Sequence, residues 1–236
     1  MPIVETLAEK GHQITTVTAH SPKTNSPNIQ KIVLKELVDI VEAEWYDFKA
    51  HGSFDAISAI QVFLSTESLA YDIFFANEKI QRIKQEKNFD IIILDGICND
   101  FIFPLIEHLG VPFITADPGC GTPWNLAAQD ISQDYATIPL QFSGFEPPMS
   151  FIQRVANVIF TETILIFRRY YLLAALDKLA KKDFPNASPI SQIERKADLL
   201  FANIHPATCP LRSLPPKLIP LGAMHVRPAK PLPQVA

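Results

Sequence analysis

The sequence lacks the glycine-rich motifs by which proteins hold a nucleotide phosphate or expose a serine nucleophile. It contains no GxGxxG segment, no Walker P-loop and no GxSxG elbow. In the first two motifs, glycine lets the backbone approach the phosphate groups, and in the third it permits the sharp turn that presents the serine. The sequence therefore gives no support for a nucleotide site or a bound cofactor within this chain.

Cysteine is scarce as well. The chain has three cysteines, at Cys98, Cys120 and Cys209. They form no CxxC pair, and no histidine stands at a spacing suited to zinc, so we expect no metal site. An odd number of cysteines argues against a full disulfide framework. We therefore expect buried free thiols.

The chain has no excess of positive charge. It carries 21 Lys and Arg against 25 Asp and Glu, which gives a net charge of −4 and a pI near 5.9. This balance argues against a nucleic-acid partner. No apolar run reaches the roughly 18–20 residues of a membrane span, because Glu162 interrupts the longest one. The first residues lack the basic start and apolar core of a signal peptide, so the chain as it stands is expected to be soluble.

The sequence does contain a series of helical and strand-like patterns. A polar, aromatic loop is expected at residues 44–47, between two of them. Helical spacing covers residues 2–10, 54–75, 78–87, 101–109, 151–181 and 190–196. Strand-like runs cover residues 13–18, 32–34, 90–94, 111–115, 197–203 and 218–221. We expect the helix over 151–181 to pack over a pocket or on the sheet. The alternative is a helix at a membrane surface, because its first half is apolar and arginines flank it.

The clearest unit lies between residues 90 and 115. The apolar run at 90–94 predicts a strand that is buried on both faces, and a helix and a second strand follow it. This βαβ order predicts an α/β fold with a Rossmann-like parallel sheet and flanking helices. The chain itself opens on a helix that leads into a strand. Such a helix normally follows an earlier strand, so we expect the first strand to be missing.

Ligands of parallel sheets bind at the carboxyl ends of the strands, where Asp95 follows the 90–94 strand directly. Asp95 is either a catalytic acid or an orienter of a histidine, or else a helix N-cap or turn residue, and position alone leaves these interpretations about even. Asp100 precedes the next helix and is predicted to be its N-cap, which favours the catalytic reading of Asp95. Asp117, before Pro118, is predicted to be a turn residue. His20 follows another strand and could line the mouth of the pocket, although a lone histidine there is more often a loop residue.

Several segments together resemble one enzyme family. Residues 7–15 match the segment LAxRGHxVT, 89–95 match FDxxxxD, 109–114 match LGVPFI, and 149–157 resemble MSFxxRxxN. Residues 215–233 follow LPPNxxxVGGLHxxPAKPLP, with Ala223 in place of a glycine. In this order, the chain resembles animal family 1 UDP-glycosyltransferases, and specifically their N-terminal, acceptor-binding half, truncated at both ends.

The resemblance implies a GT-B enzyme with two Rossmann-like domains across a cleft. The N-terminal domain would bind a small lipophilic alcohol, phenol or acid, and the C-terminal domain would bind a UDP-sugar as co-substrate. A histidine after the first strand would act as base, and an aspartate that matches Asp95 would stabilise the imidazolium. Sugar transfer would proceed with inversion. The candidate acceptor contacts are His20, Cys98, Phe101, Pro118 and Gly119.

The same resemblance sets the expected domain limits. Residues 1–226 would form the acceptor-binding domain, incomplete at its start, and 227–236 would begin the linker to the missing sugar-nucleotide domain. The base histidine would lie upstream of Met1, so the chain alone is expected to be inactive. Full-length members lie in the endoplasmic reticulum membrane and face the lumen. The alternative is a genuine short protein that binds small lipophilic molecules without chemistry.

Overall fold

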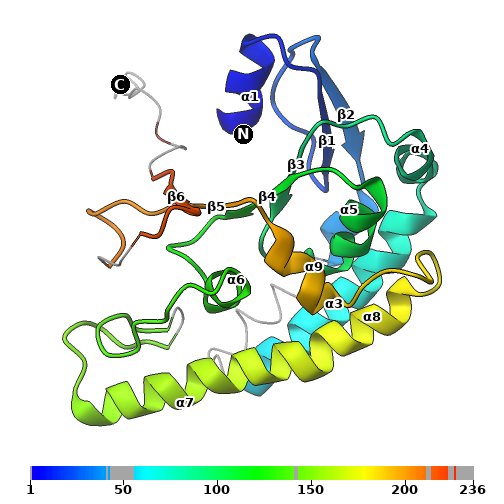
Figure 1. The fold of residues 1–236 in the computed structure, drawn as a ribbon. Helices are drawn as coiled ribbons and strands as arrows, with labels where there is room; N and C mark the ends of the chain where they lie inside the picture. Colours follow the sequence, from blue (N-terminus) through cyan, green and yellow to red (C-terminus); the bar gives the residue numbers. More distant parts are fainter. Residues whose placement is uncertain are drawn as a thin grey trace, which may run out of the picture.

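The computed structural model has parallel strands flanked by helices (Figure 1). It describes residues 2–40, 42, 56–140, 143–210, 214–222 and 226, and for 56–64 the backbone only. The loop predicted at 44–47, the linker at 227–236 and part of the matching segment at 215–233 lie outside the described residues. In the described part, the predicted α/β class with a Rossmann-like parallel sheet is confirmed.

The strands form two parallel groups. β1 (Ile14–Thr18) pairs with β2 (Ile29–Val33), while β3 (Ile92–Asp95), β4 (Phe113–Asp117), β5 (Leu199–Ala202) and β6 (Leu218–Pro220) form a sheet in that order. Within the described residues, no ladder joins β1 to β3. The sheet is therefore in two pieces, and the strand expected before the first helix stays a prediction.

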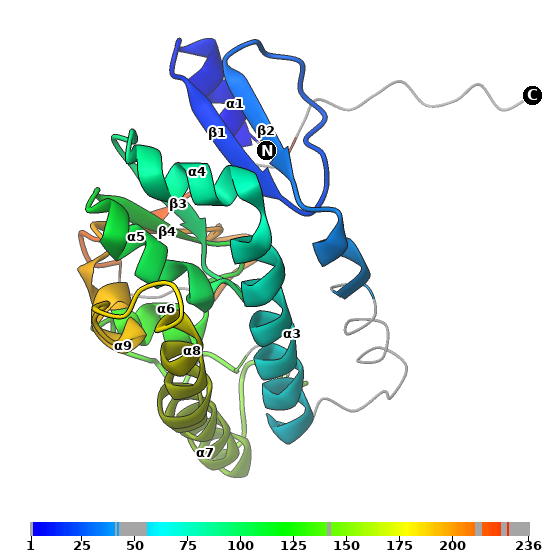
Figure 2. The ribbon, with the colours of Figure 1, turned by 90° about the vertical axis from the view of Figure 1, so that its right-hand side faces the viewer.

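The helices have the following bounds: α1 (Pro2–Glu9), α3 (Ala56–Ala76), α4 (Glu78–Glu86), η1 (Asp100–Ile102), α5 (Phe103–Leu109), α6 (Pro123–Ala128), α7 (Phe151–Phe167), η2 (Arg168–Leu172), α8 (Leu173–Ala180), α9 (Ile190–Ile193) and η3 (Glu194–Lys196). Figure 2 shows α1, β1 and β2 at one end of the molecule and α7 at the opposite end. Gly110 ends α5 as predicted, with a left-handed φ of 69°.

The helix predicted over 151–181 is broken in its middle by η2, a π-helical turn. Its start is fixed by a capping box between Ser150 and Gln153. The second half, α8, packs into the core, with Leu173 and Leu176 fully buried. The first half, α7, instead leaves a set of large apolar side chains exposed: Phe151, Ile152, Val155, Val158, Ile159, Phe160 and Ile166. No helix among the described residues combines the length and the apolar character needed to cross a bilayer.

One main core holds the two pieces of the sheet together. It joins Ile32 of β2 and Leu94 of β3 to aromatic side chains of α3, such as Phe74, and to Phe101 and Leu176. The Phe74 and Phe101 rings meet edge to face, with centroids 5.6 Å apart. Each fully buried side chain of this size contributes about 1.5–3 kcal/mol. This shared core fixes the carboxyl end of β3 against α3.

The prediction that the 90–94 strand is buried on both faces is wrong. Leu94 is 6% exposed and lies in the core, whereas Ile93 is 39% exposed. Successive side chains point to opposite faces of a strand, so β3 buries one face and leaves the other uncovered by the described residues. A run without polar residues carries no alternation that could reveal this difference.

Candidate active site

Asp95 ends β3 beside Ala116 of β4, at the carboxyl edge of the sheet. Its carboxylate accepts a hydrogen bond from the Ile97 N–H at 3.1 Å, which is the turn geometry of an aspartate that caps its own loop. Asp95 nevertheless remains exposed to solvent. Burial of the carboxyl raises the pKa of Asp95, the Ile97 hydrogen bond opposes this rise, and the charge of Asp117 adds to it.

Asp117 has the turn role predicted for it. It is 2% exposed and accepts hydrogen bonds from the Gly119 N–H at 2.8 Å, from both the N–H and the hydroxyl of Thr122, and from Asn125 Nδ2 at 2.9 Å. Asn125 Nδ2 also donates to the Gly96 carbonyl at 3.0 Å. These contacts make the loops after β3 and β4 one rigid unit around the end of the sheet.

The expectation of three buried free thiols is wrong for two of them. Cys120 and Cys209 form a disulfide with a Cα–Cα distance of 5.7 Å, across 89 residues of sequence, and Cys98 alone is free. The pairing of β4 with β5 brings the loops after both strands together, which no local spacing reveals. Pro118 and Gly119 lie in this linked loop, where the Pro118 carbonyl accepts a hydrogen bond from Asn203 Nδ2 and the Gly119 carbonyl accepts one from the Asn203 N–H. Neither residue lines the pockets described below.

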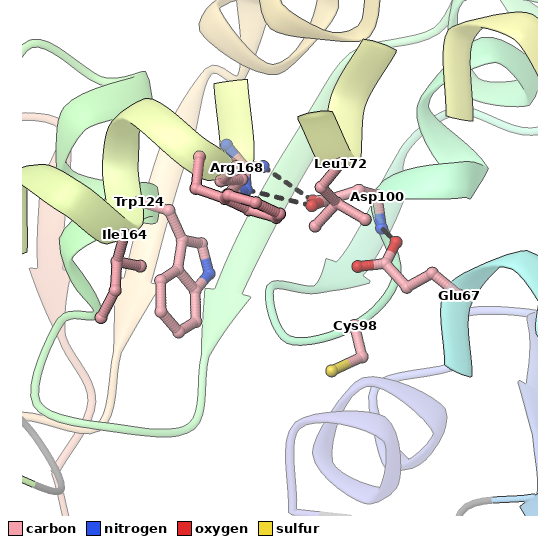
Figure 3. Close-up of a pocket in the computed structure, with 8 residues that line it drawn as sticks. Glu67, Cys98, Asp100, Trp124, Ile164, Arg168 and Leu172 are labelled. Atoms are coloured by element: carbon pink, nitrogen blue, oxygen red, sulfur yellow. Dashed lines mark hydrogen bonds and ion pairs between the residues drawn. The ribbon is translucent and has the colours of Figure 1, made fainter. Parts of the chain in front are cut away.

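A pocket opens beside the loop after β3 (Figure 3). It is lined from α3 by Glu67, from the β3 loop by Cys98 and Asp100, and from later helices by Trp124, Ile164, Phe167, Arg168 and Leu172. Its volume is about 30 Å³, enough for one or two water-sized groups. Of the predicted acceptor contacts, Cys98 lines it, whereas Phe101 is buried in the core.

Arg168, the first residue of the π turn, connects two carboxylates at the floor of this pocket, by which we mean the side formed by Glu67, Asp100 and Arg168. Its guanidinium donates to both carboxylate oxygens of Asp100, at 3.1 and 2.8 Å, and to Glu194 Oε2 at 2.7 Å. The prediction that Asp100 is an N-cap is therefore wrong. Asn99 precedes the η1 turn without a side-chain cap, and the Asp100 carboxylate turns inward to the guanidinium instead. The catalytic reading of Asp95 thus rests on its position and on the family resemblance.

Glu67 completes a cluster of three carboxyl groups around one guanidinium. It is 1% exposed and accepts a hydrogen bond from the Asp100 N–H at 2.8 Å. Burial raises the pKa of Glu67 well above its usual range, the charge of Asp100 adds to the rise, and Arg168 opposes it. Burial likewise raises the pKa of the Cys98 thiol, so this thiol stays protonated and is not an activated nucleophile.

His20 lies elsewhere, in an open depression of about 470 Å³ at the carboxyl ends of β1 and β2. Its carbonyl accepts a hydrogen bond from the Thr18 hydroxyl at 2.7 Å. In the part of the chain that the structure describes, no hydrogen bond joins Asp95 to this or any other histidine. The same part contains no group of three or more His, Cys, Asp or Glu that could hold a metal ion.

The sequence patterns missed Glu67, Trp124 and Arg168 as members of the site. Trp124 follows the loop after β4, so the rule of the carboxyl edge could have included it. Arg168 stood out only as a charge that closes an apolar run. Nothing local marks Glu67, which a helix more than 30 residues upstream contributes.

The chain matches the family model described as UDP-glucoronosyl and UDP-glucosyl transferase over residues 2–236. It is 26% identical, over 98% of its length, to UDP-glucosyltransferase 2 of Dactylopius coccus. It is 23% identical, over 98% of its length, to UDP-glucuronosyltransferase 2B19 of Macaca fascicularis and UDP-glucuronosyltransferase 2B7 of Homo sapiens. The matched regions cover 45% of the first protein and 47% of the other two, so the chain spans about half the length of these relatives. No solved structure gives a significant match.

Proposed function

Because the chain belongs to the UDP-glucoronosyl and UDP-glucosyl transferase family, we propose that it forms the acceptor-binding part of a UDP-glycosyltransferase. The whole protein would transfer a hexosyl or glucuronosyl group from a UDP-sugar to a small lipophilic acceptor, with inversion at the sugar carbon. The match over residues 2–236, together with coverage of about 45% of a relative's length, carries this proposal. The sugar-nucleotide site would belong to a further domain of that protein.

The acceptor would enter at the carboxyl edge of the β3–β4 pair. Support comes from the apolar side chains of Trp124, Ile164 and Phe167 beside the free end of β3. Binding pockets for drug-sized ligands measure roughly 300–1,000 Å³. The cavity of about 30 Å³ is far smaller, so it would hold the polar end of an acceptor while the apolar body displaces side chains around the opening.

Asp95 would act through a histidine base, not on the acceptor directly. The base takes the proton of the acceptor hydroxyl, the oxygen forms a bond to the sugar carbon, and the bond to UDP breaks. One carboxylate oxygen of Asp95 accepts a hydrogen bond from the Ile97 N–H. The other oxygen could therefore accept a hydrogen bond from an imidazolium N–H. Since no described histidine is bonded to Asp95, we propose that the chain alone is inactive.

A transfer assay tests this proposal with UDP-glucose and UDP-glucuronate as donors and a simple phenol as acceptor. The chain alone should give no glycoside, whereas the same chain continued into its sugar-nucleotide domain, with its base histidine, should. In that longer protein, Asp95→Asn should lower kcat by about 10²–10⁴-fold with little change in the acceptor KM. Asp90→Asn, at a neighbouring carboxylate that the mechanism does not use, is the matched control. Glycoside formation by the chain alone would refute its inactivity, and an unchanged kcat in Asp95→Asn would refute the role of Asp95.

The second candidate is a protein that binds lipophilic molecules without chemistry. The apolar pocket, combined with the lack of a described histidine at Asp95, favours it over other non-enzymatic roles. The same assay separates the two. Saturable binding of a phenol by the chain, together with no transfer by the longer protein under any donor, would favour this candidate.

We also propose that the whole protein lies at the endoplasmic reticulum membrane with this domain in the lumen. The Cys120–Cys209 disulfide supports an oxidising compartment. The apolar side chains exposed along α7, with Arg154 and Arg169 beside them, support a helix at a lipid surface. The fraction of protein that co-sediments with phosphatidylcholine vesicles should decrease in Ile159→Glu. It should not decrease in Ile93→Glu, because Ile93 is exposed on the sheet and not on α7. Equal sedimentation of both variants would remove the membrane proposal.

A further inference from the structure

Resting on the acceptor role proposed above, we propose that the pocket selects acceptors by charge. It takes uncharged or cationic head groups and excludes carboxylates, and Asp100, Glu194 and Glu67 set this preference. This narrows the expected acceptor class from alcohols, phenols and acids to the first two, together with amines. The charge count of the buried cluster carries the inference.

The cluster holds three carboxyl groups and one guanidinium. With Asp100 and Glu194 ionised, the charge of Arg168 offsets only one of the two, so the cluster is negative whether or not Glu67 is protonated. Glu194 contacts Arg168 but is not itself a lining residue, so it acts on the pocket through its charge. Its members are largely shielded from water, with side-chain exposures of 12% for Arg168 and Asp100 and 10% for Glu194. Water therefore screens little of their field, and a ligand carboxylate in the pocket would add a third or fourth negative charge beside the one guanidinium.

Several donors that could bind a carboxylate are already engaged. Arg168 directs two of its three nitrogens, Nε and Nη2, to its two carboxylates. The Asp100 N–H, at the start of the η1 turn, donates to Glu67, and the Trp124 indole N–H donates to the Gly96 carbonyl.

Two cations of η3, the turn that also contributes Glu194, are paired as well. Arg195 makes two contacts with Asp130, and Lys196 pairs with Glu107. In the described residues around this pocket, each of these cations therefore already faces an acidic partner. An amine or hydroxyl, in contrast, could donate to the carboxylate oxygens of the floor.

Three probes with one ring system isolate the charge: 2-naphthol, 2-naphthamide and 2-naphthoate. The amide and the carboxylate have nearly the same shape and differ by one charge. Equilibrium dialysis against the full chain at about neutral pH should show that 2-naphthamide binds at least about tenfold more tightly than 2-naphthoate. Circular dichroism and a cooperative thermal transition establish that each sample is folded.

Two pairs of variants locate the effect. Ile164→Trp fills the pocket and should abolish binding of 2-naphthol, whereas Ile166→Trp, on the exposed side of α7, should not. Glu194→Gln removes one carboxylate of the cluster and should shrink the ratio between the affinities for amide and carboxylate, whereas Glu86→Gln, an exposed position at the end of α4, should leave the ratio unchanged. If Glu194→Gln does not fold, the wild-type ratio still decides.

The outcomes are separable. If 2-naphthol and 2-naphthamide bind and 2-naphthoate binds within about threefold of them, charge selection is overturned while the acceptor role stands. If Ile164→Trp binds like the wild type, the assignment to this pocket is overturned. If none of the three probes binds to the folded chain, the acceptor role itself fails, and the inference fails with it.

Discussion

Arg168→Met should destabilise the fold more than any exposed charge substitution. The side chain contacts two carboxylates at 2.7–3.1 Å in a largely buried cluster, and methionine keeps an unbranched apolar stem without the charge. Removing one partner of a buried ion pair typically costs about 3–5 kcal/mol, because the remaining charge keeps its desolvation penalty. Against a total stability of about 5–15 kcal/mol, that loss brings the domain close to unfolding.

The pH dependence of this loss has a definite sign. Burial raises the folded-state pKa values of Glu67 and Glu194, and the charge of Arg168 lowers both. Without Arg168 they rise further, so the folded variant binds protons more readily than its unfolded chain does. A raised carboxyl pKa destabilises the fold fully above the folded pKa, and this penalty fades as the pH falls. The difference in unfolding free energy between wild type and variant should therefore be smaller at about pH 5 than at about pH 7.

Urea unfolding followed by circular dichroism measures both values. Arg168→Lys keeps the charge but loses the two-pronged contact, so it should cost less than Arg168→Met. Arg195→Met removes an exposed pair with Asp130 and should change stability by at most about 1 kcal/mol. A loss below about 1 kcal/mol for Arg168→Met, or a loss that grows as the pH falls, would show that the cluster is not a desolvated ion pair.

Three further predictions concern the loops around the site. Gly96→Ala should lower stability by about 1–3 kcal/mol, because a Cβ atom there would lie 2.5 Å from Asn125 Nδ2; an unchanged melting temperature would contradict this close packing. Replacing Cys120 and Cys209 together by serine should cost about 2–4 kcal/mol, and a reductant should have the same effect on the wild type but none on the double variant. Asn157→Ala should cost about 1–3 kcal/mol in urea unfolding, since this buried side chain makes three hydrogen bonds to the loop that precedes α7, and a neutral result would mean that the loop finds other partners.

Local patterns predicted most of the regular structure. The helix expected at 54–75 is α3, at Ala56–Ala76, and the strand expected at 90–94 is β3, at Ile92–Asp95. These elements follow from periodicity and from glycine or polar stops, which are properties of neighbouring residues. The π turn at Arg168 was not predictable in this way, since no local pattern in residues 168–172 marks it, and the side-chain partners of Arg168 lie far away in the sequence.

The candidate site was predictable only in part. Ligands of parallel sheets bind at the carboxyl ends of the strands, and this rule selected Asp95 and Cys98. The structure places both residues beside the end of β3. The partners of Arg168 lie 68 and 26 residues away, and the disulfide joins residues 89 apart. Such contacts depend on how the elements pack. Asp100 shows the same effect. Its position before a helix indicated an N-cap, but its carboxylate accepts hydrogen bonds from Arg168, which is distant in the sequence.

The π turn between α7 and α8 makes chain length itself a constraint on the pocket. In a regular helix each residue advances by about 100°, so loss of a single residue between Arg168 and Leu172 would rotate α7 against α8 by roughly that angle. Arg168 would then leave its carboxylates, or Leu173 and Leu176 would leave the core. The segment should therefore tolerate many substitutions on its outer face but no change in residue number.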